Sequence, residues 1–259
     1  MSSEGFLEEK WLKKLDHQTQ QILNRTGLDR KTMDRVFDTS TLLDLGKLIS
    51  DHVIDILDFP ISTGKEAIIF RGVTPKKEFV AAKIYRTSTL TFKHISEYIA
   101  GDPRFKGFHK NRRELVFEWA KKEFKNLERL SEAKVRAPHP LKRLNNILIM
   151  DYIGDARKPA ASLKETPIKN PEKMYNTLIE YMTRMYQNAE LVHADLSEYN
   201  ILVYRQNPYI IDVGQGVLSD HPRASEFLHR DIHNIIQFFR RYNIRADEQK
   251  IFDQVTHKT

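Results

Sequence analysis

The sequence predicts an α+β fold of two lobes, a small β-rich lobe followed by a helical lobe, with a helical extension ahead of both. Two runs rich in β-forming residues, "AIIF" and "FVAAKIY", lie close together and are joined by a Pro-Lys-Lys turn. The second half of the chain instead shows the three- and four-residue spacing of apolar residues that indicates helices. With 259 residues, 40% of them hydrophobic, the chain is large enough for two lobes that share a cleft.

Composition excludes several classes of protein. The chain has no cysteine, so disulfides and thiolate zinc sites are excluded, and a reducing, cytoplasmic location is expected. No apolar run approaches the roughly 20 residues of a membrane helix, and the N-terminus lacks the apolar core of a signal peptide. We therefore expect no membrane association. A net charge of +7 favours anionic partners such as nucleotides, nucleic acids or acidic lipid.

The first part of the chain supplies the extension and the small lobe. Residues 1–50 are the expected helical extension, and the helical pattern continues to about Ile56. Residues 51–150 are the expected small lobe, in which a Gly-containing loop precedes the β-hairpin. Within this lobe, residues from about 87 to 111 show no clean period and predict an irregular insertion.

A long helix, "RRELVFEWAKKEFKNLERLSEA", is expected after the insertion, followed by the strand "NNILIMDYIG". One stripe of the helix is apolar and should be buried: Val116, Trp119, Ala120, Leu127 and Leu130. Residues 151–259 are the expected helical lobe. It contains the helix "PEKMYNTLIEYMTRMYQNAE", the strand "YIIDVG" and a last helix ending in "FFRRY", whose Phe side chains should enter the core.

The segment "LVHADLSEYNILV" places polar residues between two apolar runs that are suited to burial. Asp195 and Asn200 are five residues apart, and Asp212 follows twelve residues later. Mg²⁺ prefers oxygen ligands and takes only one or two from the protein, a role that fits Asn200 and Asp212. In phosphoryl transfer a separate carboxylate accepts the proton of the attacking group, or orients that group, and Asp195 fits this role. Taken singly, each residue is also compatible with an Asx-turn or a helix cap.

A lysine and a glutamate extend this set. Lys83 lies in the apolar run "AAKIY", where an unpaired ammonium would cost several kcal/mol. The long helix offers a partner, Glu123, which falls on its buried stripe, forty residues after Lys83. A strand lysine, a helix glutamate, His-x-Asp-x₄-Asn and Asp-x-Gly occur in the order found in protein kinases. The fold predicted from the residues is therefore two-lobed and protein-kinase-like.

Three motifs resemble those of the RIO atypical protein kinases, in their type-1 branch: "STGKEA", "HADLSEYN" and "IDVGQ". The resemblance runs from about Arg35 to Tyr242 and includes "LDFPISTGKEA", "RFKG", "EWAKKEFKNL" and "MDYIG". The winged-helix domain of the type-2 branch would need more than the 61 residues that precede Ser62. The short tail is similar to that of archaeal members.

The resemblance implies a role for each matching position. Lys83 would contact the α- and β-phosphates of ATP and pair with Glu123. Asp195 would be the catalytic aspartate, and Asn200 and Asp212 would hold Mg²⁺ or Mn²⁺. The loop over the phosphates would consist of Ser62, Thr63, Gly64, Lys65, Glu66 and Ala67. The adenine pocket would be bordered by Met150, with backbone hydrogen bonds from Asp151 and Ile153.

The sequence departs from ordinary kinases in ways that bear on function. The phosphate loop has a single glycine, and only 45 residues follow Gly214, with no A-P-E motif, so we expect a truncated helical lobe without a peptide-docking platform. The resemblance implies an autophosphorylating serine/threonine kinase, an ATPase, or both, acting in maturation of the small ribosomal subunit. The alternative is an RNA- or ribosome-binding assembly factor that uses ATP only as a conformational switch. The sequence predicts no oligomeric state.

Further residues remain open to two interpretations. Ser88, Thr89, Thr91 and Ser96 of the insertion are the expected autophosphorylation sites. The alternative is that the insertion is a solvated loop in which these hydroxyls occur by chance. Residues 104–125 contain eight Lys and Arg but only three Glu. This excess of positive charge is compatible with binding of pre-ribosomal RNA or with a solvated helix face. His229 and His233 have the spacing of a metal pair but no third ligand in register. Asp231 is either an anchor for the Asp195 loop or a surface residue.

Overall fold

The computed structural model describes residues 37–87 and 111–257. Most of the expected extension, nearly all of the insertion and the hydroxyls of Ser88, Thr89, Thr91 and Ser96 lie outside the described residues. The described chain divides into two compact units. The first comprises residues 37–87, 111–121 and 140–152, and the second comprises 122–139 and 153–257. The boundaries at 50 and 150 expected from the sequence stay a prediction.

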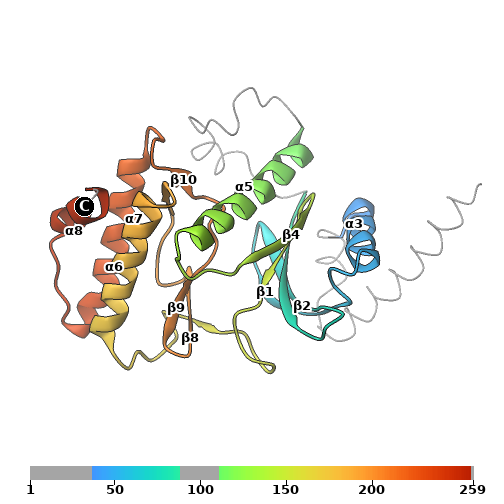
Figure 1. The fold of residues 1–259 in the computed structure, drawn as a ribbon, viewed down its shortest axis with the longest axis horizontal. Helices are drawn as coiled ribbons and strands as arrows, with labels where there is room; N and C mark the ends of the chain where they lie inside the picture. Colours follow the sequence, from blue (N-terminus) through green and yellow to red (C-terminus); the bar gives the residue numbers. More distant parts are fainter. Residues whose placement is uncertain (1–36, 88–110, 258–259) are drawn as a thin grey trace, which may run out of the picture. The chain divides into compact units, whose positions relative to one another are not determined.

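The first unit is built on a five-stranded antiparallel sheet with the strand order β1-β2-β3-β5-β4. Its strands are β1 (Ile56–Thr63), β2 (Ala67–Val73), β3 (Phe79–Tyr85), β4 (Pro140–Leu144) and β5 (Ile147–Asp151). The predicted hairpin of β2 and β3 is confirmed, and its register sets Ile69 opposite Lys83. Helix α3 (Thr39–Ser50) packs on this sheet (Figure 1). Leu45 and Leu48 of α3 enter the core that the sheet residues Ile68 and Phe70 help to form.

Helix α3 is shorter than the sequence pattern predicted. It begins after Asp38, whose side chain accepts a hydrogen bond from the Thr41 amide at 2.8 Å, as expected of an N-cap. It ends at Ser50, so the expectation that the helix reaches Ile56 is wrong. His52 adopts a left-handed backbone with φ 57°, which an α-helix cannot accommodate. The apolar residues that follow, among them Ile54, are buried as the chain enters the sheet.

The second unit is mainly helical. Helix α5 (Arg112–Glu132) begins in the first unit and enters the second at Lys122. The other helices are α6 (Pro171–Gln187), α7 (Ala224–Phe239), the 3₁₀ turn η2 (Arg240–Tyr242) and α8 (Glu248–Thr256). Short strands form two small sheets, one with the order β6-β8-β9 and one pairing β10 with β7. Their bounds are β6 (Ala161–Ser162), β7 (Leu191–Val192), β8 (Ile201–Tyr204), β9 (Asn207–Ile210) and β10 (Val217–Leu218).

The helical predictions for this unit are largely confirmed. Helices α5 and α6 occur where the apolar spacing placed them, and the expected stripe of α5 is buried. Phe238 and Phe239 at the end of α7 are 3% and 0% exposed, so they enter the core as expected. Helices α6 and α7 run side by side in Figure 1. No helix in the part of the chain that the structure describes is both long and apolar enough to cross a membrane.

Helix α8 was not predicted, and it accounts for the two histidines of α7. The ring of His229 stacks on Phe252, with the ring centroids 4.0 Å apart, and His233 Nδ1 lies 2.8 Å from Glu248 Oε1. Within 37–87 and 111–257, no group of three or more His, Cys, Asp or Glu could hold a metal ion. The metal-pair interpretation of His229 and His233 is therefore wrong for these residues. Both histidines of α7 instead contact α8, His229 by ring stacking and His233 through Glu248.

Candidate active site

The loop between β7 and β8 carries Asp195 and Asn200 and has a defined internal geometry. The Asn200 side-chain amide Nδ2 donates to the Asp195 backbone oxygen at 2.8 Å and to its carboxylate Oδ2 at 3.2 Å. Both side chains are half-buried. Because the nitrogen of Asn200 is turned toward Asp195, its Oδ1 is the atom suited to a cation. The amide therefore orients the carboxylate and offers an oxygen ligand at the same time.

Asp212 is held next to this loop through the residue before it. The Ile211 amide donates to the Asn200 carbonyl at 3.0 Å, and the Ile211 carbonyl lies 3.0 Å from His193 Nε2. Asp212 itself is exposed. Burial is the main cause that raises the pKa of Asp195, and the negative charge of Asp212 adds to it. The structure therefore brings together Asp195, Asn200 and Asp212, as the sequence predicted.

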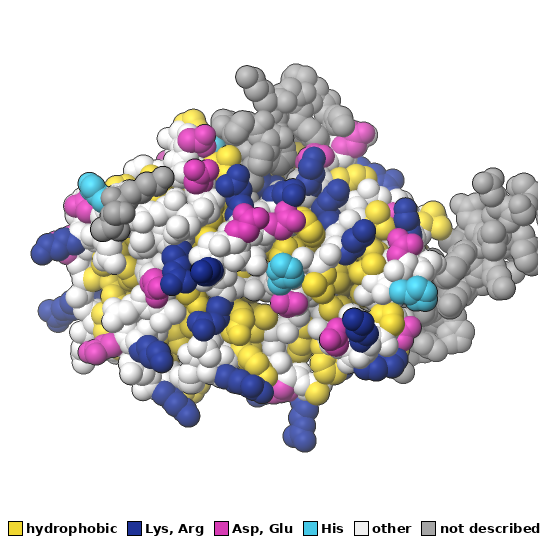
Figure 2. All heavy atoms as spheres, viewed as in Figure 1, with side chains coloured by type: hydrophobic (Ala, Val, Ile, Leu, Met, Phe, Trp, Pro, Cys, Tyr) yellow, Lys and Arg dark blue, Asp and Glu magenta, His cyan; other side chains and the backbone are white. Residues whose placement is uncertain are grey.

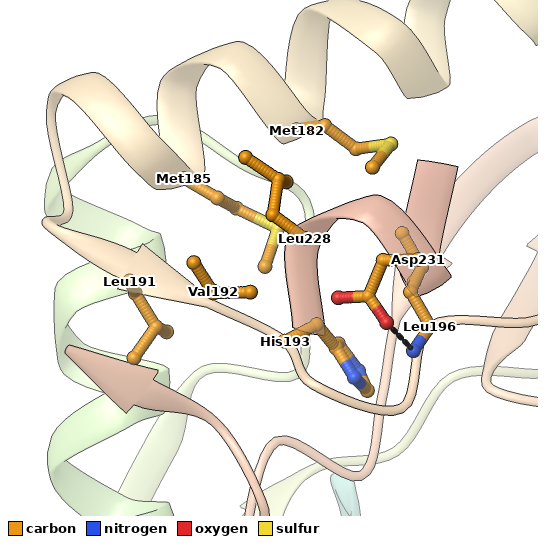
Figure 3. A pocket seen from close by; sticks show the side chains of 8 residues that line it. All are labelled: Met182, Met185, Leu191, Val192, His193, Leu196, Leu228 and Asp231. Atoms are coloured by element: carbon orange, nitrogen blue, oxygen red, sulfur yellow. Dashed lines mark hydrogen bonds between the residues drawn. The ribbon is translucent and has the colours of Figure 1, made fainter. Parts of the chain in front are cut away.

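Helix α7 holds the loop from beneath. Asp231 is 1% exposed and accepts hydrogen bonds from the Ala194 and Leu196 amides, both at 2.8 Å. Figure 3 shows its carboxylate directed at the Leu196 nitrogen. Arg230 donates to the Ala194 carbonyl, and the Asn234 amide donates to the Leu196 carbonyl at 3.0 Å. The expectation that Asp231 anchors the loop is confirmed, and the surface interpretation is wrong.

Burial dominates the electrostatics of these groups. Burial first, and the charge of Asp212 in addition, raise the pKa of Asp195, which makes it a better proton acceptor than an exposed aspartate. Burial lowers the pKa of His193, so the imidazole is neutral and its Nε2 carries the proton that is donated to Ile211. Burial also raises the pKa of Asp231 to about 7, against the opposing hydrogen bonds from Leu196 and Ala194.

A small pocket lies behind the loop (Figure 3). It is lined by apolar side chains such as Met182, Met185 and Leu228, together with His193 and Asp231. Its volume of about 10 Å³ is at the lower limit for one water molecule and excludes a substrate. The side chains that line the pocket therefore support the loop, and the pocket does not bind the reactants.

Two residues of the site have a backbone that non-glycine residues rarely adopt. Ala194 has a φ of 66° and Asp212 a φ of 60°, both in the left-handed region. Such conformations cost about 1–3 kcal/mol and persist only where the surroundings impose them. For Ala194 the surroundings are the hydrogen bonds from α7 described above.

The first unit holds the expected phosphate-binding residues. Lys83 on β3 is 6% exposed, and its Nζ lies 5.1 Å from the centre of the Tyr85 ring. The expected phosphate loop is the turn between β1 and β2, closed by a hydrogen bond of 2.9 Å from the Gly64 amide to the Ala67 carbonyl. Ser62 and Thr63 occupy the last two positions of β1. Of the six expected residues, Ser62, Thr63, Gly64 and Lys65 are exposed, whereas Glu66 is half-buried and Ala67, the first residue of β2, is buried.

The remaining expected residues are divided between the units. Met150 and Asp151 end β5, and Met150 is buried whereas Asp151 is exposed. Ile153 begins the second unit, and its carbonyl accepts a hydrogen bond from the Ala160 amide at 2.9 Å. Glu123 is 1% exposed on α5, as its place on the apolar stripe predicted. Since Glu123 belongs to the second unit and Lys83 to the first, their pairing stays a prediction.

Sequence reasoning missed two buried polar residues of α5. Asn126 is 0% exposed and Lys122 is 2% exposed, and both donate to backbone carbonyls of the segment that follows Asp212. Their position beside the apolar stripe was the available signal. Lys122 was instead counted among the basic residues of a solvated or RNA-binding face.

The fold and the site define a class of protein before any relative is considered. A β-sheet unit, a long helix and a helical unit with an Asp-x₄-Asn loop are the arrangement of protein kinases. Solved structures agree on the fold. A crystal structure of the Rio2 kinase from Chaetomium thermophilum, in an ADP/Mg²⁺-phosphoaspartate complex, matches with a TM-score of 0.66. It is 23% identical, and the match covers 84% of this chain and 66% of that one.

Sequence comparison identifies the family. The RIO domain model matches residues 68–251. The RIO-type serine/threonine-protein kinase Rio1 of Haloferax volcanii is 41% identical over 226 residues, which cover 87% of this chain and 78% of that protein. The human serine/threonine-protein kinase RIO1 is also 41% identical, over 88% of this chain and 41% of its own length. The chain belongs to the RIO family.

Proposed function

We propose that the chain is an ATP-dependent serine/threonine kinase of the RIO type, which phosphorylates itself and also hydrolyses ATP. The observation that carries the proposal is the gathering of Asp195, Asn200 and Asp212 on one hydrogen-bonded loop system. The relatives support it, because Rio1 proteins of archaea and eukaryotes are named serine/threonine-protein kinases.

In this proposal Asp195 accepts the proton of the attacking hydroxyl or water. Its raised pKa favours that role, and the Asn200 amide fixes the orientation of the carboxylate. Asn200 Oδ1 and the exposed carboxylate of Asp212 would hold Mg²⁺ or Mn²⁺, since both are the hard oxygen donors that these ions prefer. When bound, the ion neutralises charge on the phosphate oxygens.

The nucleotide contacts proposed for the first unit follow the family resemblance. The segment from Ser62 to Ala67, whose residues up to Lys65 are exposed, would cover the phosphates, and Lys83 would contact the α- and β-phosphates and pair with Glu123. Met150 would border the adenine, with backbone hydrogen bonds from Asp151 and Ile153. The burial of Lys83 on β3 supports a defined role for its ammonium, because a buried cation is retained only where it is compensated.

ADP release in the presence of Mg²⁺ tests the function. The wild type should release ADP, and Asp212→Ala should reduce the rate by at least about 100-fold if the divalent ion is essential. Equal rates in the two proteins would rule out the assignment. Repeating the reaction with γ-labelled ATP separates the two activities, because label on protein indicates a kinase and free phosphate an ATPase.

We also propose that the chain acts on the small ribosomal subunit in the cytoplasm, with pre-ribosomal RNA as a partner. Arg112 and Arg113 at the exposed start of α5 support an RNA contact. Further along α5, Lys121 and Lys125 are paired with glutamates of the same helix, and Arg113 lies 3.7 Å from the Asp38 carboxylate. On the face shown in Figure 2, basic and acidic side chains are interspersed. RNA binding should weaken with salt and with loss of Arg112 and Arg113, and binding insensitive to both would refute the contact.

A further inference from the structure

The backbone conformation of the segment that carries Asp212 depends on contacts with other parts of the chain. Asp212 is exposed and has a left-handed backbone, and the chain turns directly after it, where the Gly216 amide donates to the Val213 carbonyl at 3.1 Å. Strand β10 then pairs with β7, register Val217 to Val192. An exposed aspartate held at φ 60° relaxes to an ordinary conformation unless the following residues are fixed. The contacts that fix them come from α5.

Asn126 makes the closest of these contacts. Its side chain is fully buried, and its Nδ2 donates to the Val213 carbonyl at 2.7 Å and to the Gly216 carbonyl at 3.2 Å. The two protons of one amide group therefore close the turn from both ends. The fit is tight, because a Cβ at Gly216 would lie 3.1 Å from Asn126 Nδ2. A larger residue at Gly216 would therefore require its neighbours, Asn126 among them, to shift.

Lys122 adds a second contact one helical turn earlier on α5. Its Nζ donates to the Gln215 carbonyl at 3.3 Å, and the residue is 2% exposed. Burial of an ammonium is costly, and a lysine that served only the surface would extend into solvent. Its neighbours do so: the side chains of Lys121 and Lys125 are 52% and 60% exposed and pair with glutamates of the same helix. Lys122 alone of these three reaches the Asp212 segment.

We infer that Lys122 and Asn126 are positioning residues that hold the backbone after Asp212 in the conformation required for binding the divalent ion. The inference rests on the proposed function, in which Asp212 is a metal ligand. Asn126 and Lys122 contact neither the ion nor the nucleotide in this scheme. They act through the carbonyls of Val213, Gln215 and Gly216. Glu123 lies on the same turn of α5, so one helix would set both the ion site and the partner of Lys83.

Direct measurement of ion binding distinguishes positioning from plain core packing. Binding of Mn²⁺ is followed by electron paramagnetic resonance, with a non-hydrolysable ATP analogue present, for the full chain and for Asn126→Ala and Lys122→Met. Residues that orient a metal ligand typically change metal affinity about 10- to 100-fold when lost, so we expect the dissociation constant for Mn²⁺ to rise at least about 10-fold. The dissociation constant of the analogue without metal should not change.

Matched variants complete the experiment. Lys125→Met removes an exposed lysine from the same helix and should leave Mn²⁺ affinity unchanged, whereas Lys122→Arg keeps a cationic donor and should recover most of it. Unchanged Mn²⁺ affinity in both Asn126→Ala and Lys122→Met, with binding lost in Asp212→Ala, would overturn the inference and leave the proposed function standing. Unchanged affinity in Asp212→Ala would overturn the function itself. If Asn126→Ala does not fold, Lys122→Met decides the inference by the same criterion.

Discussion

At the residue scale, a single buried carboxylate holds the loop between β7 and β8, which carries Asp195. Asp231 provides the hydrogen-bond acceptor that the buried backbone amides of Ala194 and Leu196 would otherwise lack. A buried amide left without an acceptor costs about 1–3 kcal/mol. Loss of both hydrogen bonds would therefore remove a substantial fraction of the free energy of unfolding of a typical domain. The charge of Asp231 is itself disfavoured by burial, which raises its pKa to about 7. The loop is therefore held by a group that titrates near neutrality.

This titration predicts a pH dependence of stability. In the folded protein Asp231 keeps its proton up to about pH 7, whereas at its ordinary value of 3.8 the unfolded chain loses it. Between these values the folded state binds more protons, so the Asp231 contribution to the free energy of unfolding falls as pH rises. We expect Asp231→Asn to lack this component. Urea unfolding of both proteins from pH 4 to 8 measures the difference, in which the titration of His193 cancels, and parallel profiles would contradict it.

The residues of the site were predictable only where their neighbours in sequence gave a pattern. Asp195, Asn200 and Asp212 stand out because polar residues interrupt apolar runs, and Glu123 because it falls on a buried stripe. Lys122 and Asn126 lie beside the apolar stripe of α5, which indicates burial but not a partner, because their partners are backbone carbonyls about ninety residues away. A backbone acceptor has no sequence identity, so its donor cannot be recognised from composition.

At the scale of elements, strong periodicity was a reliable guide and weak periodicity was not. The β2–β3 hairpin and helices α5 and α6 follow their apolar spacing. Strand β4 was missed because it is an edge strand that begins with Pro140 and carries the basic residues Lys142 and Arg143 next to an exposed Leu141, so no alternation is visible. Helix α8 was missed because Val255 is its sole buried residue. The end of α3 depends on the backbone of His52, which residue type does not determine.

Helix α3 offers a direct test of element packing, because two leucines on it differ in burial. Leu48 is 0% exposed and Leu43 is 36% exposed. Leu48→Ala should lower the free energy of unfolding by about 2–5 kcal/mol through lost burial and a residual cavity. Leu43→Ala should change it by less than about 1 kcal/mol. Chemical denaturation measures both, and equal effects would show that α3 does not pack on the sheet through Leu48.

At the scale of the whole molecule, the proposed residues are shared between two units of different construction. The antiparallel sheet of the first unit carries Lys83 and the turn that begins at Ser62, and the helical second unit carries Asp195 and Asp212. The division predicts that neither unit is sufficient for nucleotide binding with a metal. The order of motifs along the chain indicated this plan, and the RIO family match supports it.

Binding of a non-hydrolysable ATP analogue, measured by calorimetry with and without Mg²⁺, tests most directly the proposal that residues of both units bind one nucleotide. Mg²⁺ should tighten binding to the wild type. Lys83→Met should weaken binding in both conditions, because its ammonium is proposed to contact the phosphates, whereas Asp212→Ala should abolish only the effect of Mg²⁺. If the analogue binds wild type, Lys83→Met and Asp212→Ala with equal affinity in both conditions, these residues do not surround one nucleotide and the account is wrong.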